Sequence, residues 1–253
     1  MVTIARYLSL AEFSYDRDDN PGSINGFVVR RREFATVLGD GFQGVVHEGD
    51  DEVIVAFSGT LGGLLTAPIS QTTADLRIGV NIIPNMAGSA KALVKAAAQT
   101  AKPVSIVGHS LGGALAQVVG VWMGIPFISF NGPGMTTHLR MSAINVIKPR
   151  QMRRTLKAQP LAQANGICFS VMGDLVGNFG IHVGAFVAVP WDGGRGSRHD
   201  LDAIRGGLGE SIGREPWWWA NGFYSRRISA ATAPQINLNI GPSFSQSMHR
   251  FMI

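Results

Sequence analysis

The chain has 253 residues, of which 45% are hydrophobic and 15% are charged, and its formal net charge is +5 at pH 7. This composition excludes a disordered or highly charged chain, and it fits one large α/β domain with a sizeable core over residues 1–253. A single cysteine, Cys168 in an apolar run, excludes an intramolecular disulfide framework and is expected to be a buried, inert thiol.

Several functional classes find no support in the sequence. There is no metal-ligand spacing, no phosphate-binding glycine loop and no nucleic-acid module, so we expect no metal, no cofactor and no nucleic-acid partner. No apolar run is long enough for a transmembrane helix and no Sec-type leader is visible, which predicts a cytoplasmic protein or one exported by a leaderless route. Modest basic clusters suit either a solvated face or transient contact with an anionic membrane surface: Arg30–Arg32, Lys148–Arg154 and Arg226–Arg227.

The first third of the chain predicts a helix, a hairpin and a central strand. Apolar spacing indicates a helix over Ile4–Phe13, and the turn-rich segment Asp16–Asn25 separates it from two strands, Gly26–Val37 and Gly44–Glu48, that can pair as a hairpin. The continuous apolar run Val53–Phe57 is typical of a strand buried on both faces.

The loop after this strand has a chemical interpretation. It reads Ser58-Gly59-Thr60, and in serine hydrolases a loop in this place supplies one donor to the oxyanion. Thr60 is therefore a candidate oxyanion residue, although the segment is equally compatible with an ordinary loop. The apolar, glycine-containing stretch Leu61–Thr73 that follows is compatible with a lid or with a packed loop, and a helix is expected over Asn85–Gln99.

The most informative stretch is a strand, a tight turn and a helix around Ser110. An apolar strand over Pro103–Val107 runs into Gly108-His109-Ser110-Leu111-Gly112, and an apolar helix is expected over Ala114–Met123. A serine between glycines in this context is typical of a nucleophile elbow, in which a strained turn exposes the hydroxyl. Ser110 is the predicted nucleophile, and the backbone N–H of Leu111 is the predicted second oxyanion donor.

Three further strands follow the elbow helix: Ile125–Phe130, Gly166–Met172 and Ala185–Val189. A helix over Thr136–Ile147 is expected between the first two, and Ser197–Leu201 is expected to open a short helix after the third. Asp174 follows the second of these strands directly, which is where a hydrolase of this kind carries its acid.

Three histidines are candidates for the general base. The order nucleophile, acid, histidine leaves His182, His199 and His249, since the remaining histidines precede Asp174. His199 lies one strand beyond Asp174 and is the preferred base, whereas His182 is the alternative base and His249 is the least favoured. His109 neighbours the nucleophile, but its side chain is expected to leave the turn on another side.

These motifs together resemble the class 3 lipases, from the N-terminal helix to about Leu201. Gly108–Gly113 resembles the serine motif, Thr60 stands at the oxyanion position, Gly173-Asp174-Leu175-Val176 resembles the acid motif, and His199 fits the closing histidine. Ser58 stands where the family often has arginine, and Asn131-Gly132-Pro133-Gly134 also departs from its pattern. These departures look more like a bacterial lipase-like branch, some members of which are effectors delivered without a signal peptide.

The resemblance implies an α/β-hydrolase fold with a mostly parallel central sheet and helices on both faces. It implies a lipase, phospholipase or esterase that acts on a lipid or other ester substrate through an acyl-enzyme on Ser110. An acyltransferase or thioesterase with the same triad, and a non-catalytic lipid- or partner-binding hydrolase fold, are the alternatives. Acyl-chain length, phospholipid against neutral lipid, and oligomeric state stay open.

Overall fold

The computed structural model describes residues 2–16, 22–34, 41–59, 86–144, 153, 161, 164–191, 193 and 196–213. Several features named above therefore lie outside the described residues: the candidate donor Thr60, the stretch Leu61–Thr73, the basic pair Arg226–Arg227, the histidine His249, and the basic cluster Lys148–Arg154 apart from Arg153.

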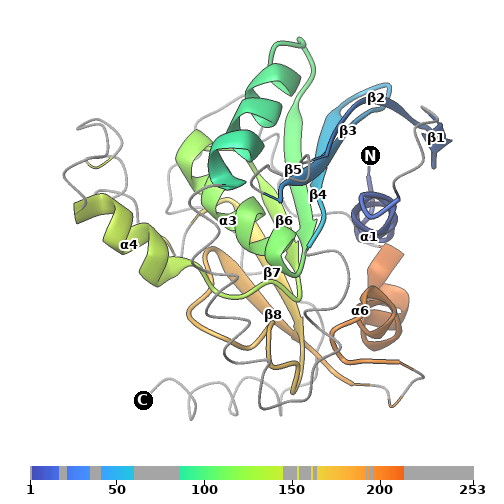
Figure 1. The fold of residues 1–253 in the computed structure, drawn as a ribbon. Coiled ribbons are helices and arrows are strands. Elements are labelled where there is room, and N and C mark those ends of the chain that lie inside the picture. Colours follow the sequence, from blue (N-terminus) through green and yellow to red (C-terminus); the bar gives the residue numbers. More distant parts are fainter. Residues whose placement is uncertain are drawn as a thin grey trace.

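An eight-stranded sheet runs through the described part of the chain, and its strand order follows the sequence (Figure 1). The strands are β1 (Ser23–Ile24), β2 (Phe27–Phe34), β3 (Gln43–Glu48), β4 (Val53–Phe57), β5 (Val104–His109), β6 (Phe127–Phe130), β7 (Gly166–Val171) and β8 (Ala185–Val189). Neighbours from β1 to β4 pair antiparallel, and neighbours from β4 to β8 pair parallel. The expected hairpin is the β2–β3 pair, whereas the short strand β1 lies in a segment that was expected to be only a turn.

Helices cover both faces of this sheet (Figure 1). One face carries α3 (Leu111–Met123) and the helical residues 86–97, and the other carries α1 (Ile4–Phe13) and α6 (Leu201–Leu208). The helix α4 (Thr136–Ile144) follows β6, and a 3-10 helix, η2 (Gly209–Gly213), follows α6. No helix among the described residues is both long and apolar enough to span a bilayer.

The central strand β4 shows why the sheet needs cover on both sides. Val53, Val55 and Phe57 pack into the core under α3, while Ile54 and Ala56 pack into the core under α1 and α6. All five side chains are at most 1% exposed. Since successive side chains of a strand point to opposite faces of the sheet, a strand with no polar residue must be covered on both faces. Each fully buried large aliphatic or aromatic side chain stabilises the fold by roughly 1.5–3 kcal/mol.

The helix that follows the central serine starts earlier than the sequence predicted. It begins at Leu111 rather than at Ala114, because Gly112 and Gly113 belong to the helix and not to the turn. An added Cβ on Gly112 would overlap the carbonyl oxygens of Phe57 and Ser58, and one on Gly113 would meet the Ser129 hydroxyl. The two glycines therefore allow α3 to lie directly against the ends of β4 and β6.

Candidate active site

Ser110 lies in a strained turn between β5 and α3. Its backbone has φ +57° and ψ −125°, a combination that L-residues rarely adopt. Gly108 makes the turn possible, because a Cβ there would overlap the carbonyl group of Gly112. The result is a serine side chain at the carboxyl ends of the parallel strands, 4% exposed.

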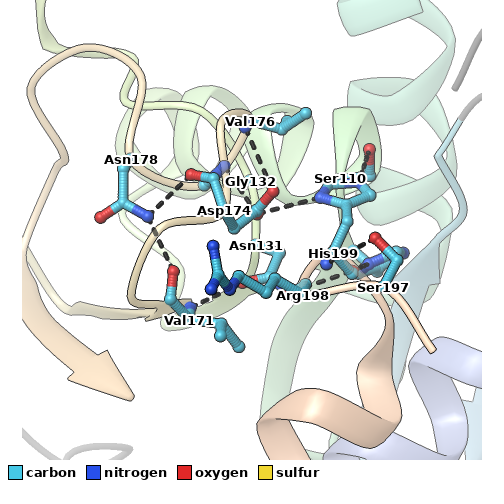
Figure 2. A network of polar contacts seen from close by, with 12 residues as sticks. Ser110, Asn131, Gly132, Val171, Asp174, Val176, Asn178, Ser197, Arg198 and His199 are labelled. Atoms are coloured by element: carbon cyan, nitrogen blue, oxygen red, sulfur yellow. Dashed lines mark hydrogen bonds and ion pairs between the residues drawn. The ribbon is translucent and has the colours of Figure 1, made fainter. Parts of the chain in front are cut away.

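The structure brings together the three side chains predicted to form the catalytic group (Figure 2). The Oγ of Ser110 lies 2.8 Å from Nε2 of His199, and Nδ1 of His199 lies 3.0 Å from Oδ2 of Asp174. A carboxylate can only accept, so Nδ1 of a neutral His199 carries the proton and donates it. Nε2 is then free to accept from the Ser110 hydroxyl, which is the arrangement a general base needs.

Backbone donors hold the Asp174 carboxylate in place. Oδ2 accepts from the N–H of Gly177 at 2.8 Å, and Oδ1 accepts from the N–H of Val176 at 3.2 Å. Asn178 closes the turn by donating to the carbonyl oxygens of Val171 and Asp174, both at 2.7 Å. The carboxylate is 4% exposed, so its orientation is set by these bonds rather than by solvent.

His199 is presented by a turn and not by a helix. The N–H of Ser197 donates to Oδ2 of Asp200 at 2.8 Å, and the N–H of His199 donates to the Ser197 hydroxyl at 3.1 Å. These side chains compete with helical bonds, so the expected short helix, α6, begins only at Leu201, the last residue of the segment expected to open it. The 25-residue separation between His199 and Asp174 is closed by the β7–β8 pair.

His182, the alternative base, lies elsewhere. Its Nε2 is 3.0 Å from the carbonyl oxygen of Gly132, and its ring lies 4.6 Å from that of Phe186. Burial lowers its pKa below the usual range. Its backbone oxygen accepts from the Thr136 hydroxyl at 2.9 Å, so its contacts join the loops that follow β6 and β7.

Of the two candidate oxyanion donors, the structure describes Leu111, whereas Thr60 lies outside the described residues. Leu111 is the first residue of α3, so its N–H has no acceptor within the helix. Gly59, the last described residue before Thr60, lies against the nucleophile: a Cβ on it would be 2.9 Å from Cβ of Ser110. The loop that ends β4 thus reaches Ser110 at the residue directly before Thr60 in the sequence.

The site also contains three buried or half-buried residues that were not predicted to take part in it: Asn131, His109 and Tyr15. Asn131 donates to the carbonyl oxygens of Arg198 and His199, at 3.1 Å and 3.0 Å, and accepts from the N–H of Val171. His109 points away from Ser110, as expected, and contacts Tyr15 and the carbonyl oxygen of His199. Burial lowers the pKa of His109 to about 3, so its ring is neutral.

One protein-family model matches this chain. Residues 23–170, more than half of the chain, match the family model described as a Tle-like phospholipase domain. The match contains Ser110 and Leu111 and ends before Asp174 and His199. A search of curated protein sequences finds no match.

Among solved structures, the chain is similar to fungal lipases. The Rhizomucor miehei lipase propeptide complex aligns with TM-score 0.39 and 16% identity over 52% of this chain and 52% of that chain. The Lip2 lipase of Yarrowia lipolytica aligns with TM-score 0.45 and 13% identity over 75% and 77%. A triacylglycerol lipase of Penicillium expansum aligns with TM-score 0.39 and 14% identity over 84% and 90%. Similarities this distant carry no weight for substrate or mechanism.

The predicted α/β fold is confirmed, with a mixed sheet that is parallel from β4 to β8 and helices on both faces (Figure 1). The expected class of enzyme, a carboxylic ester hydrolase that acts on lipid esters, is confirmed by the family model. The chain belongs to the family of Tle-like phospholipase domains.

Proposed function

We propose that this protein hydrolyses the acyl esters of phospholipids, with Ser110 as nucleophile, His199 as general base and Asp174 as the acid that orients it. The observation that carries the proposal is the continuous chain of contacts from Ser110 Oγ through the His199 ring to the Asp174 carboxylate, at 2.8 Å and 3.0 Å. Phospholipid is preferred to neutral lipid because the matching family is a phospholipase family.

The contacts support a two-step reaction through an acyl-enzyme. His199 takes the Ser110 proton on Nε2 as Oγ attacks the ester carbonyl, and Asp174 stabilises the imidazolium that forms. The N–H of Leu111 and the donor groups of Thr60 stabilise the tetrahedral oxyanion. Its collapse breaks the ester bond, and His199 returns the proton to the leaving alcohol. Water, activated by the same histidine, then releases the fatty acid and restores Ser110.

Contact with the lipid surface is supported by the loop that carries the acid. Large apolar side chains on this loop are 37–61% exposed, although they lie beside the site: Met172, Leu175, Phe179 and Ile181. We propose that they meet the membrane transiently while a lipid enters. The departures at Ser58 and at Asn131–Gly134 support the finer proposal of a bacterial lipase-like branch.

The test is lipid mass spectrometry after incubating vesicles of mixed phosphatidylcholine, phosphatidylethanolamine and triacylglycerol with the wild type and with Ser110→Ala. The expected result is fatty acid and lysophospholipid from the wild type and neither from the variant. Ser9→Ala is the matched control, since the Ser9 hydroxyl donates to Ala5 within α1. A wild type that a fluorophosphonate probe does not label, or a Ser110→Ala protein of undiminished activity, contradicts the proposal.

A further inference from the structure

A half-buried chain of hydrogen bonds connects the loop after β4 with the backbone of the base. The N–H of Gly59 donates to the Tyr15 hydroxyl at 2.8 Å, and this hydroxyl lies 2.6 Å from Nδ1 of His109. Nε2 of His109 lies 2.8 Å from the carbonyl oxygen of His199. Four segments far apart in the sequence thus meet through two side chains, those of Tyr15 and His109, which we call the Tyr–His bridge.

Each group of the Tyr–His bridge has one available role. The His199 carbonyl can only accept, so Nε2 of His109 must carry a proton and donate it. A neutral imidazole with Nε2 protonated offers Nδ1 as an acceptor, so the Tyr15 hydroxyl donates to it. The hydroxyl oxygen is then left to accept from Gly59. Burial favours the neutral forms throughout, since it lowers the pKa of His109 to about 3 and raises the pKa of Tyr15.

The two ends of the Tyr–His bridge are the two sides of the candidate reaction centre. At one end, Gly59 lies against Cβ of Ser110 and directly precedes Thr60. At the other end, the carbonyl oxygen of His199 receives a second bond from Asn131 at 3.0 Å, which fixes this backbone from another direction. The His109 and His199 rings also lie 4.9 Å apart, so the base packs directly on the bridge.

We propose that Tyr15 and His109 are positioning residues that hold the oxyanion loop and the base at a fixed separation across Ser110. This proposal rests on the proposed function. Neither residue touches the substrate or the Ser110 hydroxyl; each acts through the backbone of the group it holds. Because misplacing a reacting group by about 1 Å can cost about a hundredfold in rate, loss of the bridge should slow acylation and leave substrate binding largely unchanged.

Three substitutions separate this role from simple packing. His109→Phe keeps a ring in the buried site and removes both hydrogen bonds. His109→Gln supplies an amide that can accept from Tyr15 and donate to the His199 carbonyl, so it should rescue the bridge in part. Tyr15→Phe removes only the hydroxyl. The measurements are kcat and KM on a short-chain nitrophenyl ester, the rate of fluorophosphonate labelling of Ser110, and the thermal unfolding midpoint.

We expect His109→Phe to lower kcat and the labelling rate about 10- to 100-fold with KM within about twofold, and Tyr15→Phe to lower them about tenfold. His109→Gln should recover most of the loss. The double variant Tyr15→Phe/His109→Phe should be no slower than His109→Phe alone, because the two residues act as one unit.

The proposal is overturned if Tyr15→Phe, with an unchanged unfolding midpoint, keeps wild-type kcat, or if His109→Gln is no faster than His109→Phe. A change in KM alone also overturns it. Nitrogen NMR of histidine-labelled protein supplies a readout that does not need turnover. His109 should be the Nε2–H tautomer in both the wild type and Tyr15→Phe, because the His199 carbonyl accepts from Nε2 in both, and only the Nδ1 signal should shift when the Tyr15 hydroxyl is removed. A wild type that turns over no ester and is not labelled refutes the proposed function, whereas unaffected variants of an active wild type refute only the bridge.

Discussion

Replacing Asp174 by asparagine tests the electrostatic part of the candidate triad apart from its geometry. An asparagine has one oxygen where the carboxylate has two, so its amide must choose an orientation. With the oxygen at the Oδ2 position it keeps the short bond from Gly177 and the bond from His199, and its NH2 group faces only the weaker donor, Val176. The reverse orientation would place NH2 against two donors, so the structure favours the first.

The magnitude follows from this orientation. The His199 tautomer is retained, and the rate is lost mainly because a negative charge no longer stabilises the imidazolium. At a charge separation of about 4 Å and an effective dielectric constant of about 20, that interaction contributes about 4 kcal/mol. We therefore expect Asp174→Asn to lower kcat about a thousandfold. Asp174→Ala should cost more, since it also leaves the N–H groups of Val176 and Gly177 without acceptors.

The assay is kcat on a short-chain nitrophenyl ester, which avoids effects of lipid binding. Asp202→Asn is the matched control, because Asp202 is an exposed carboxylate on α6 paired with Arg205, and it should retain wild-type activity. An Asp174→Asn protein within about tenfold of the wild type would refute the role of Asp174 as the orienting acid. A crystal structure of the variant with the NH2 group toward His199 would refute the reasoning about its orientation.

Four other substitutions test the fold. Gly112→Ala should destabilise the protein by about 1–3 kcal/mol and reduce activity, because the new methyl group pushes α3 away from β4. Gly88→Ala should stabilise the protein by about 0.5–1 kcal/mol, because Gly88 faces open space on the helix over residues 86–97. Urea unfolding measures both effects. Burial raises the pKa of Glu52 from 4.5 to about 8. Between these two pH values the folded state keeps a proton that the unfolded state releases, so the stability contributed by Glu52 falls as the pH rises toward 8. Glu52→Gln should make the unfolding midpoint less dependent on pH between these values. Gln117→Leu should cost about 1–3 kcal/mol, since Gln117 accepts from the N–H groups of Met135 and Val183, which would lose that acceptor, and equal thermal midpoints for variant and wild type would contradict this.

The features that could be predicted from sequence are those with a local pattern. The run Val53–Phe57 has the composition of a doubly buried strand, and the glycines around Ser110 mark a turn that few other residues tolerate. Asp174 could be named because β7 ends just before it, and His199 could be named because it follows Asp174 with one further strand, β8, between them. The start of α3 could not be predicted, because two adjacent glycines, Gly112 and Gly113, are locally typical of a turn. Only the structure shows that both are helical, and that each is a glycine because residues distant in the sequence leave no room for a side chain.

The supporting residues could not be predicted for a related reason. Tyr15 and His109 are separated by 94 residues, and no periodicity links the end of one helix with a turn so far along the chain. The signals that could have drawn attention were the histidine beside the nucleophile and the break Asn131–Gly134 after a buried strand. Both become informative only once the sheet brings the ends of β5, β6 and β8 to one edge.

The sequential strand order has a consequence for biosynthesis. Each strand pairs with the one made just before it, so the sheet can grow in the direction of translation, as domains that begin folding on the ribosome do. Ser110 is made 89 residues before His199, which at about 5–20 residues per second is a delay of roughly 4–18 s. During that interval the nascent chain carries an elbow with no base beside it. A ribosome-bound chain that ends before β8 should therefore leave the lipids of its own cell intact.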